Sequence, residues 1–229
     1  MPSERPFYIR LLMVVYSAWL IVFESVGRYA ATLATHDPTT SLDRLIPVVP
    51  EAVWLYDFCF VLPLVILFVV HEGHLLNRAV IAIFVSTLSA CVVYLLYPVA
   101  YPLPELGTSI SDRLLALHYE LDFRPGANKL PSLHVANAWM IWLAVRSSGV
   151  RRVTRTVFLV LAITISLSTL LVKQHLILDV ALGFVWAFPS WWLAGTLYAR
   201  INRYGLSGAD TVRALWSPSL RSRQARPNP

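Results

Sequence analysis

Two short stretches of the chain carry side chains whose types and spacing suit chemistry, and each lies at the edge of a long apolar run. The first, residues 173–179, reads KQHLILD. If a helix begins near His175, then Asp179 lies four residues further along on the same face. A carboxylate within reach of an imidazole fixes its tautomer and stabilises positive charge on it, as a histidine nucleophile or acid–base group requires. A polar cluster that caps a membrane helix would explain the same residues.

The second stretch, residues 130–136, reads LPSLHVA and opens another apolar run. Pro131 suits a first helical turn, because its missing N–H would be unpaired there in any case. The free N–H groups and positive dipole end of such a helix attract an anion, and Ser132 adds a hydroxyl donor beside His134. Two histidines, an aspartate, a lysine and an anion-binding helix start on one membrane face indicate phosphoryl chemistry.

Composition places these stretches in a membrane protein. Of the 229 residues, 57% are hydrophobic and only 14% are charged, and the mean hydropathy is +0.60. A soluble domain of this length could not bury so much apolar surface. The net charge of +6 comes from arginines that flank apolar runs, which indicates membrane topology and no nucleic-acid partner. Cys59 and Cys91 both lie inside apolar runs, so neither a disulfide framework nor a thiolate metal site is expected.

The apolar runs predict an all-α fold, a six-span transmembrane helix bundle that forms a single domain over residues 1–229. The predicted spans cover residues 11–33, 52–70, 79–100, 132–145, 153–172 and 179–198. Between the third and fourth spans, residues 109–121 have the pattern of a short amphipathic helix. The arginine-rich tail, residues 204–229, is predicted to be cytoplasmic and partly disordered.

The remaining histidines are predicted to lie away from the chemistry. His71 and His74 fall in a short turn between the second and third spans, residues 71–78, and are interpreted as interfacial loop residues. Their spacing is not that of the zinc-protease motif, and a third ligand is not evident. His118, on the amphipathic helix, is predicted to be a surface histidine.

Arginine distribution predicts the orientation in the cell membrane. Six spans put both termini on one side, together with the arginine-rich loop at residues 146–155, and the positive-inside rule makes that side cytoplasmic. The span ends that carry Tyr97, His134 and His175 then meet on the extracytoplasmic side, as does the amphipathic helix. The three ends could have fallen on different sides, so their agreement supports a common site.

These motifs resemble those of the type 2 phosphatidic acid phosphatase superfamily. Residues 131–134 resemble its second motif, and Ser168 with His175 and Asp179 resembles its third. The form around the third motif is similar to bacterial members. Leu133 replaces the usual glycine, as in the branch that contains inositol phosphorylceramide synthases. The six-span plan also fits, and the resemblance covers roughly residues 97–188, the expected catalytic core.

The resemblance is incomplete where the family binds phosphate. The family's first motif, a lysine followed seven residues later by Arg-Pro, is absent in that form, and Thr169 replaces the arginine usual after the third-motif serine. The basic residues that could compensate are, in the expected order, Lys173, Lys129 and Arg124, with Ser132 as a further phosphate-binding group.

The resemblance implies a two-step transfer that needs neither metal nor cofactor. His175 would attack phosphorus to give a phosphohistidine, with Asp179 orienting its ring. His134 would protonate the leaving oxygen and then activate the incoming water or alcohol. The implied partner, besides the bilayer, is a lipid phosphate, either a phosphomonoester or a pyrophosphate, which keeps its tails in the membrane.

Three alternatives remain open from the sequence. A phosphotransferase with the same core would pass a phospho-headgroup to an alcohol such as inositol. A transporter or scaffold would retain the fold without catalysis, although transporters often carry broken helices and internal repeats that are not evident here. A metal site would use His134, His175 and Asp179. Neither the lipid nor the oligomeric state is predicted.

Overall fold

The computed structural model describes residues 5–122 and 127–203, and this part of the chain is helical without β-strands. In chain order the helices are α1 (Arg5–Ala30), α2 (Ser41–Leu45), the 3-10 helix η2 (Pro50–Ala52), α3 (Val53–Val69), α4 (Gly73–Leu96), α5 (Ile110–Leu121), α6 (Leu133–Ser147), α7 (Arg152–Leu171) and α8 (Ile177–Arg203). The all-α prediction is therefore confirmed over the described residues. The tail at residues 204–229 lies outside them.

Four helical segments among the described residues are long and apolar enough to cross a membrane. They are Pro50–Val69, Gly73–Leu96, Arg152–Leu171 and Ile177–Asn202. Neither α1 nor α6 is among them. Helix α6 has 15 residues, which at about 1.5 Å per residue is shorter than the ~30 Å hydrocarbon core. Six spans therefore remain a prediction, whereas four apolar helices fit a membrane protein.

Helix α6 occupies the centre of the bundle and packs against α3, α4, α7 and α8. Small side chains allow this close packing, because they let helix backbones approach one another. Ala136 and Ala144 of α6 and Ala187 of α8 have no exposed surface. Gly183 lies where α8 passes the start of α6, and a Cβ there would be 2.5 Å from the carbonyl oxygen of Ser132. The first turns of α6 and α8 are therefore held side by side.

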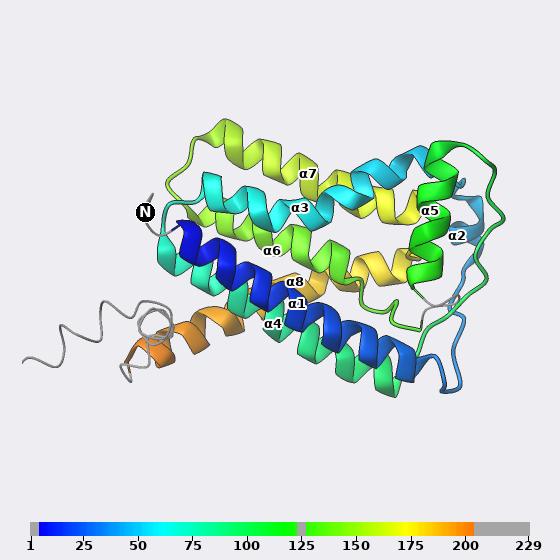
Figure 1. Cartoon of the computed structure of the whole chain (residues 1–229), viewed down its shortest axis with the longest axis horizontal. Coiled ribbons are helices and arrows are strands. Elements are labelled where there is room, and N and C mark those ends of the chain that lie inside the picture. Colours follow the sequence, from blue (N-terminus) through cyan, green and yellow to red (C-terminus); the bar gives the residue numbers. More distant parts are fainter. Residues whose placement is uncertain (1–4, 123–126, 204–229) are drawn as a thin grey trace, which may run out of the picture.

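The two ends of the bundle differ in what they carry (Figure 1). The start of α1, the end of α8 and the α3–α4 and α6–α7 connections lie at one end, and α2 and α5 lie at the other. The two connections touch, since the Gly149 N–H donates to Glu72 Oε1 over 2.8 Å. The starts of α6 and α8 consequently share the end opposite the start of α1 and the end of α8.

The short turn predicted at residues 71–78 is wrong, because α4 already begins at Gly73. His74 and Arg78 are therefore helical. The Arg78 guanidinium donates to the carbonyl oxygen of Trp191 from Nε at 3.0 Å and from Nη2 at 2.9 Å, and it lies 4.2 Å from the centre of that indole ring. This pairing with α8 explains how an arginine fits inside an apolar helix.

The predicted amphipathic helix is present as α5, and a capping box of Ser109 and Asp112 begins it. Its buried face packs Leu115 and Tyr119 against α3. The prediction of His118 as a surface residue is wrong. His118 is half-buried, and its Nε2 lies 2.7 Å from Asp57 Oδ1 of α3. The helix period that buries Leu115 also turns this imidazole towards α3.

Candidate functional site

Ser132 fixes the start of α6. Its hydroxyl oxygen accepts from the Val135 N–H at 3.4 Å as the N-cap of the helix, and its own N–H donates to the carbonyl oxygen of Asp179 at 3.1 Å. Pro131 therefore precedes the cap, and the prediction that it lies in the first turn is wrong, because the serine takes the capping position. The Pro131 carbonyl accepts from the Tyr94 hydroxyl at 2.9 Å.

A compact loop between α7 and α8 positions His175. The N–H groups of Gln174 and His175 both donate to the Thr169 carbonyl at 3.1 Å, and Lys173 takes a left-handed conformation with φ of 52°. Helix α8 begins at Ile177, so His175 precedes it. Asp179 lies in the first turn of α8, and its Oδ2 accepts from the Leu176 N–H at 2.9 Å.

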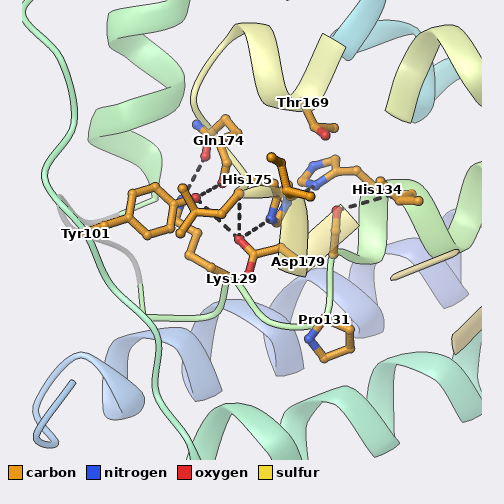
Figure 2. Close-up of polar contacts among 12 residues, drawn as sticks. Tyr101, Lys129, Pro131, His134, Thr169, Gln174, His175 and Asp179 are labelled. Carbon is orange, nitrogen blue, oxygen red and sulfur yellow. Dashed lines mark hydrogen bonds and ion pairs between the residues drawn. The ribbon is translucent and has the colours of Figure 1, made fainter. Parts of the chain in front are cut away.

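The structure brings both imidazoles and the carboxylate together (Figure 2). His134 Nδ1 lies 3.3 Å from His175 Nε2, and His175 Nδ1 lies 3.5 Å from Asp179 Oδ2. His175 is 4% exposed and Asp179 is fully buried. The three side chains form one line of contacts, in which each nitrogen of His175 faces a different partner.

Burial sets the protonation state of His175. Loss of solvent around the ring, together with the positive charge of Lys129, lowers the pKa of His175 to about 3. The imidazole is therefore neutral near pH 7, and its Nε2 lone pair is available to a phosphorus atom once the contact with His134 opens. A buried neutral imidazole beside a carboxylate suits a nucleophile.

Lys129 is the basic residue that the structure places beside the imidazoles. It is 3% exposed, and its Nζ donates to Gln174 Oε1 at 2.8 Å and to Asp122 Oδ2 at 3.3 Å. All three side chains line a small cavity with His134 and His175. This cavity joins a cation and two imidazoles, the groups that an anionic phosphate needs.

Lys173 lies elsewhere. Its Nζ donates to the Asp43 carbonyl oxygen at 2.8 Å, and it is not among the cavity-lining residues. The geometry therefore does not support ranking Lys173 above Lys129 as a phosphate ligand. Arg124 lies outside the described residues. The Ser168 and Thr169 hydroxyls donate to carbonyls of their own helix, α7.

Helix α2 clamps the loop that carries His175. Asp43 is 4% exposed, and its Oδ1 accepts from the Ile177 N–H at 2.8 Å, while Lys173 bonds to its carbonyl. Burial opposes ionisation of Asp43, but hydrogen bonds from Ile177 and Thr40 outweigh it and lower the pKa of the carboxyl. The loop is thus attached to the segment between α1 and α3.

Sequence reasoning missed two tyrosines that complete the site. The Tyr56 hydroxyl of α3 lies 2.8 Å from His134 Nε2. The Tyr101 hydroxyl donates to the Gln174 carbonyl at 2.8 Å and lies 3.5 Å from Asp179 Oδ2. Tyr101 lies in the segment between α4 and α5 and is only 5% exposed. The available signal was a phenolic hydroxyl in apolar surroundings, which needs a buried partner.

Comparison with known families agrees with this geometry. Residues 49–193, more than half of the chain, match the family model described as the PAP2 superfamily. No curated protein and no solved structure matches the chain. The matched range runs from just before α3 into α8 and contains every contact of His134 and His175 described above. Members of this superfamily are phosphatases and phosphotransferases. The chain belongs to the PAP2 superfamily.

Proposed function

We propose that the protein is a membrane-embedded lipid phosphatase that hydrolyses a phosphomonoester or pyrophosphate of a lipid through a phosphohistidine at His175. The observation that carries the proposal is the direct contact between His134 and His175, backed by Asp179 and flanked by Lys129. Membership of a superfamily of phosphatases and phosphotransferases supports the reaction class.

In the first step, His175 Nε2 attacks phosphorus and the bond from phosphorus to the lipid oxygen breaks. His134 gives the proton on its Nδ1 to that leaving oxygen. The Nε2–Nδ1 separation of 3.3 Å leaves no room for a phosphoryl group between the rings, so substrate binding parts them. The Asp179 carboxylate lies 3.5 Å from His175 Nδ1 and stabilises the charge that develops on the ring.

In the second step, a water molecule attacks the phosphohistidine. His134 Nδ1 takes a proton from the water, the new P–O bond forms, and the P–N bond to His175 breaks. Phosphate then leaves, and both imidazoles return to their starting protonation states. The same geometry serves acid and base catalysis in turn, because the incoming oxygen takes the place of the departing one.

Lys129 is proposed to hold the non-bridging phosphate oxygens, whose negative charge must be stabilised as bonds break. In the substrate-free structure its ammonium group is held by Gln174 and Asp122. Binding therefore exchanges the Asp122 contact for one with phosphate. Arg124 remains a candidate for the same role, whereas the Ser132 hydroxyl caps α6.

Transfer to an alcohol is a second candidate, favoured by one observation. Leu133 replaces a glycine of the related motif, is 2% exposed and lines the cavity next to His134. An apolar wall there disfavours ordered water and suits an organic acceptor. The branch that contains inositol phosphorylceramide synthases resembles this chain in having leucine at the position of Leu133, which supports this candidate. A purified preparation that forms a transfer product when alcohols are added supports it, and release of phosphate alone supports hydrolysis.

We further propose that the end of the bundle carrying α2 and α5 faces the extracytoplasmic side of the cell membrane. The opposite end carries the α6–α7 connection, where Arg151, Arg152 and Arg155 cluster. Positive charge of this kind marks cytoplasmic loops. Accessibility of single engineered cysteines to an impermeant thiol reagent in intact cells tests the orientation.

Replacement of each histidine tests the mechanism. His175→Ala is expected to abolish phosphate release from a lipid phosphate while the protein still inserts in the membrane. His134→Asn is expected to leave slow formation of a phosphoenzyme that accumulates, since the nucleophile remains. His74→Ala, an exposed histidine at the other end of the bundle, is the matched control. Near-normal turnover by His175→Ala, or no labelled protein under any condition, would contradict the scheme.

A further inference from the structure

Tyr56 of α3 contacts the imidazole that the mechanism uses for proton transfer. Its hydroxyl oxygen lies 2.8 Å from His134 Nε2, and the two ring centres are 4.6 Å apart. Tyr56 is 2% exposed, so water does not compete for this hydrogen bond. The Nε2 atom is therefore occupied by the protein, and Nδ1 is the nitrogen that faces His175.

We propose that Tyr56 is a positioning residue that fixes Nδ1 of His134 as the atom through which protons pass to and from the reacting oxygens. The inference rests on the proposed function, in which His134 serves as acid and then as base. It adds a residue of α3, outside the motifs that carry the two histidines.

Hydrogen-bond complementarity assigns the tautomers of the resting site. One proton lies between His134 Nδ1 and His175 Nε2. If this proton belonged to His175 Nε2, the neutral ring would carry no proton on Nδ1. The Nδ1 lone pair would then face the Asp179 carboxylate 3.5 Å away, so that two acceptors would oppose each other. If His134 supplies it, His175 Nδ1–H faces the carboxylate and the Tyr56 hydroxyl donates to His134 Nε2. This second arrangement pairs a donor with an acceptor at every contact.

The phenolic hydroxyl also suits the other states of the ring, because it can accept as well as donate. When an anionic phosphate binds, His134 takes up a second proton from the solvent and its Nε2–H then donates to the Tyr56 oxygen; this proton returns to the solvent when phosphate leaves. After Nδ1–H has passed to the leaving group, the proton on Nε2 stays in place and Nδ1 presents a lone pair to the incoming water. Tyr56 gains and loses no proton over the cycle. The phenyl ring of a phenylalanine can neither donate a hydrogen bond to His134 Nε2 nor accept one from it.

Tyr56→Phe tests the proposal against a matched control. The variant keeps the ring packing on Phe60 and His118. Tyr119→Phe removes an equally buried hydroxyl that donates to the Val172 carbonyl at 2.7 Å, away from His134. Loss of a hydrogen bond to a charged ring predicts phosphoenzyme formation about ten- to a hundredfold slower in Tyr56→Phe, with KM unchanged and with the control near wild type.

Leaving-group dependence separates positioning from a general structural loss. Two aryl phosphates, phenyl phosphate and 4-nitrophenyl phosphate, are compared in single turnovers in detergent micelles. The nitrophenolate leaves with little need of a proton, so the loss in Tyr56→Phe should be several times smaller for it than for phenyl phosphate. An equal loss for both substrates overturns the proposal.

A spectroscopic measurement tests the same contact without turnover. Nitrogen-15 NMR of histidine-labelled protein in bilayers reports the tautomer of each ring, and the His134 signals are those lost in His134→Asn. We expect a neutral His134 protonated at Nδ1 in the wild type and a mixture of tautomers in Tyr56→Phe. A wild-type His134 ring protonated at Nε2 overturns the assignment. The expected spectra without phosphatase activity would reject the proposed function and retain the contact.

Discussion

Asp179→Asn probes the charge behind the proposed nucleophile. Asp179 Oδ2 lies 3.5 Å from His175 Nδ1, and Asp179 has no exposed surface. When His175 becomes phosphorylated, its ring gains positive charge. At an effective dielectric constant of about 20, a pair of unit charges at that separation is worth about 5 kcal/mol. Loss of the negative charge should therefore slow phosphoenzyme formation by roughly five-thousandfold.

The asparagine amide removes the charge of Asp179 and can keep its contacts. Its oxygen can keep the hydrogen bond from the Leu176 N–H, which is 2.9 Å long in the wild type. The same oxygen then also faces His175 Nδ1, which lies 3.5 Å from Oδ2 in the wild type, and the NH₂ group takes the place of Oδ1. The backbone at the start of α8 should stay folded and the imidazole should keep its preferred tautomer, so the slower rate reports the lost charge.

Rapid-quench single turnovers of a radiolabelled lipid phosphate, with labelled protein and free phosphate both measured, provide the assay. Asp57→Asn is the matched control, because its carboxylate also pairs with an imidazole, 2.7 Å from His118 Nε2, but not with His175. Its rate should stay within about threefold of wild type. If Asp179→Asn keeps more than about a tenth of the wild-type rate, the electrostatic role assigned to Asp179 is refuted.

Two further predictions concern binding and stability. Lys129→Met should raise the KM for a lipid phosphate by about tenfold or more, whereas Lys173→Met should leave this KM within about threefold of wild type. The reason is that Lys129 lines the cavity and Lys173 does not. Similar KM changes in steady-state assays of the two variants would contradict this assignment. Burial lowers the pKa of His175 from 6.5 to about 3. Between these two pH values the unfolded chain binds more protons than the folded chain. The free energy of unfolding therefore falls as the pH is lowered. Thermal unfolding in detergent from pH 7 to pH 4 should show this loss, and His175→Gln should reduce it; an unchanged slope in the variant would assign the effect to other groups.

The sequence predicted the helices well because long apolar runs and capping residues act locally. Ser109 with Asp112 begins α5 as a capping box, within the range predicted for the amphipathic helix, and Ser132 caps α6 where the fourth span was expected to start. The meeting of His134 and His175 also follows from topology, since two helices that start at one end of a bundle bring their first turns together.

Contacts between distant segments could not be predicted in the same way. Tyr56 precedes His134 by 78 positions, and no motif connects the two. The direction of a loop side chain depends on its backbone, and Lys173 at φ 52° bonds to Asp43 of the five-residue helix α2. Helix α2 is too short for a hydrophobic periodicity to predict it from the sequence. The choice between two nearby lysines was therefore decided by tertiary structure.

The absence of a Cβ atom at Gly183 limits the substitutions that can raise the thermal stability of this protein. Replacement of a glycine inside a helix by alanine usually stabilises it, by about 1 kcal/mol. At this position the added methyl would come within 2.5 Å of a backbone oxygen, that of Ser132. A thermostabilisation screen should therefore leave Gly183 unchanged. Alanine at this position would push α6 and α8 apart at the point where the reacting groups are aligned.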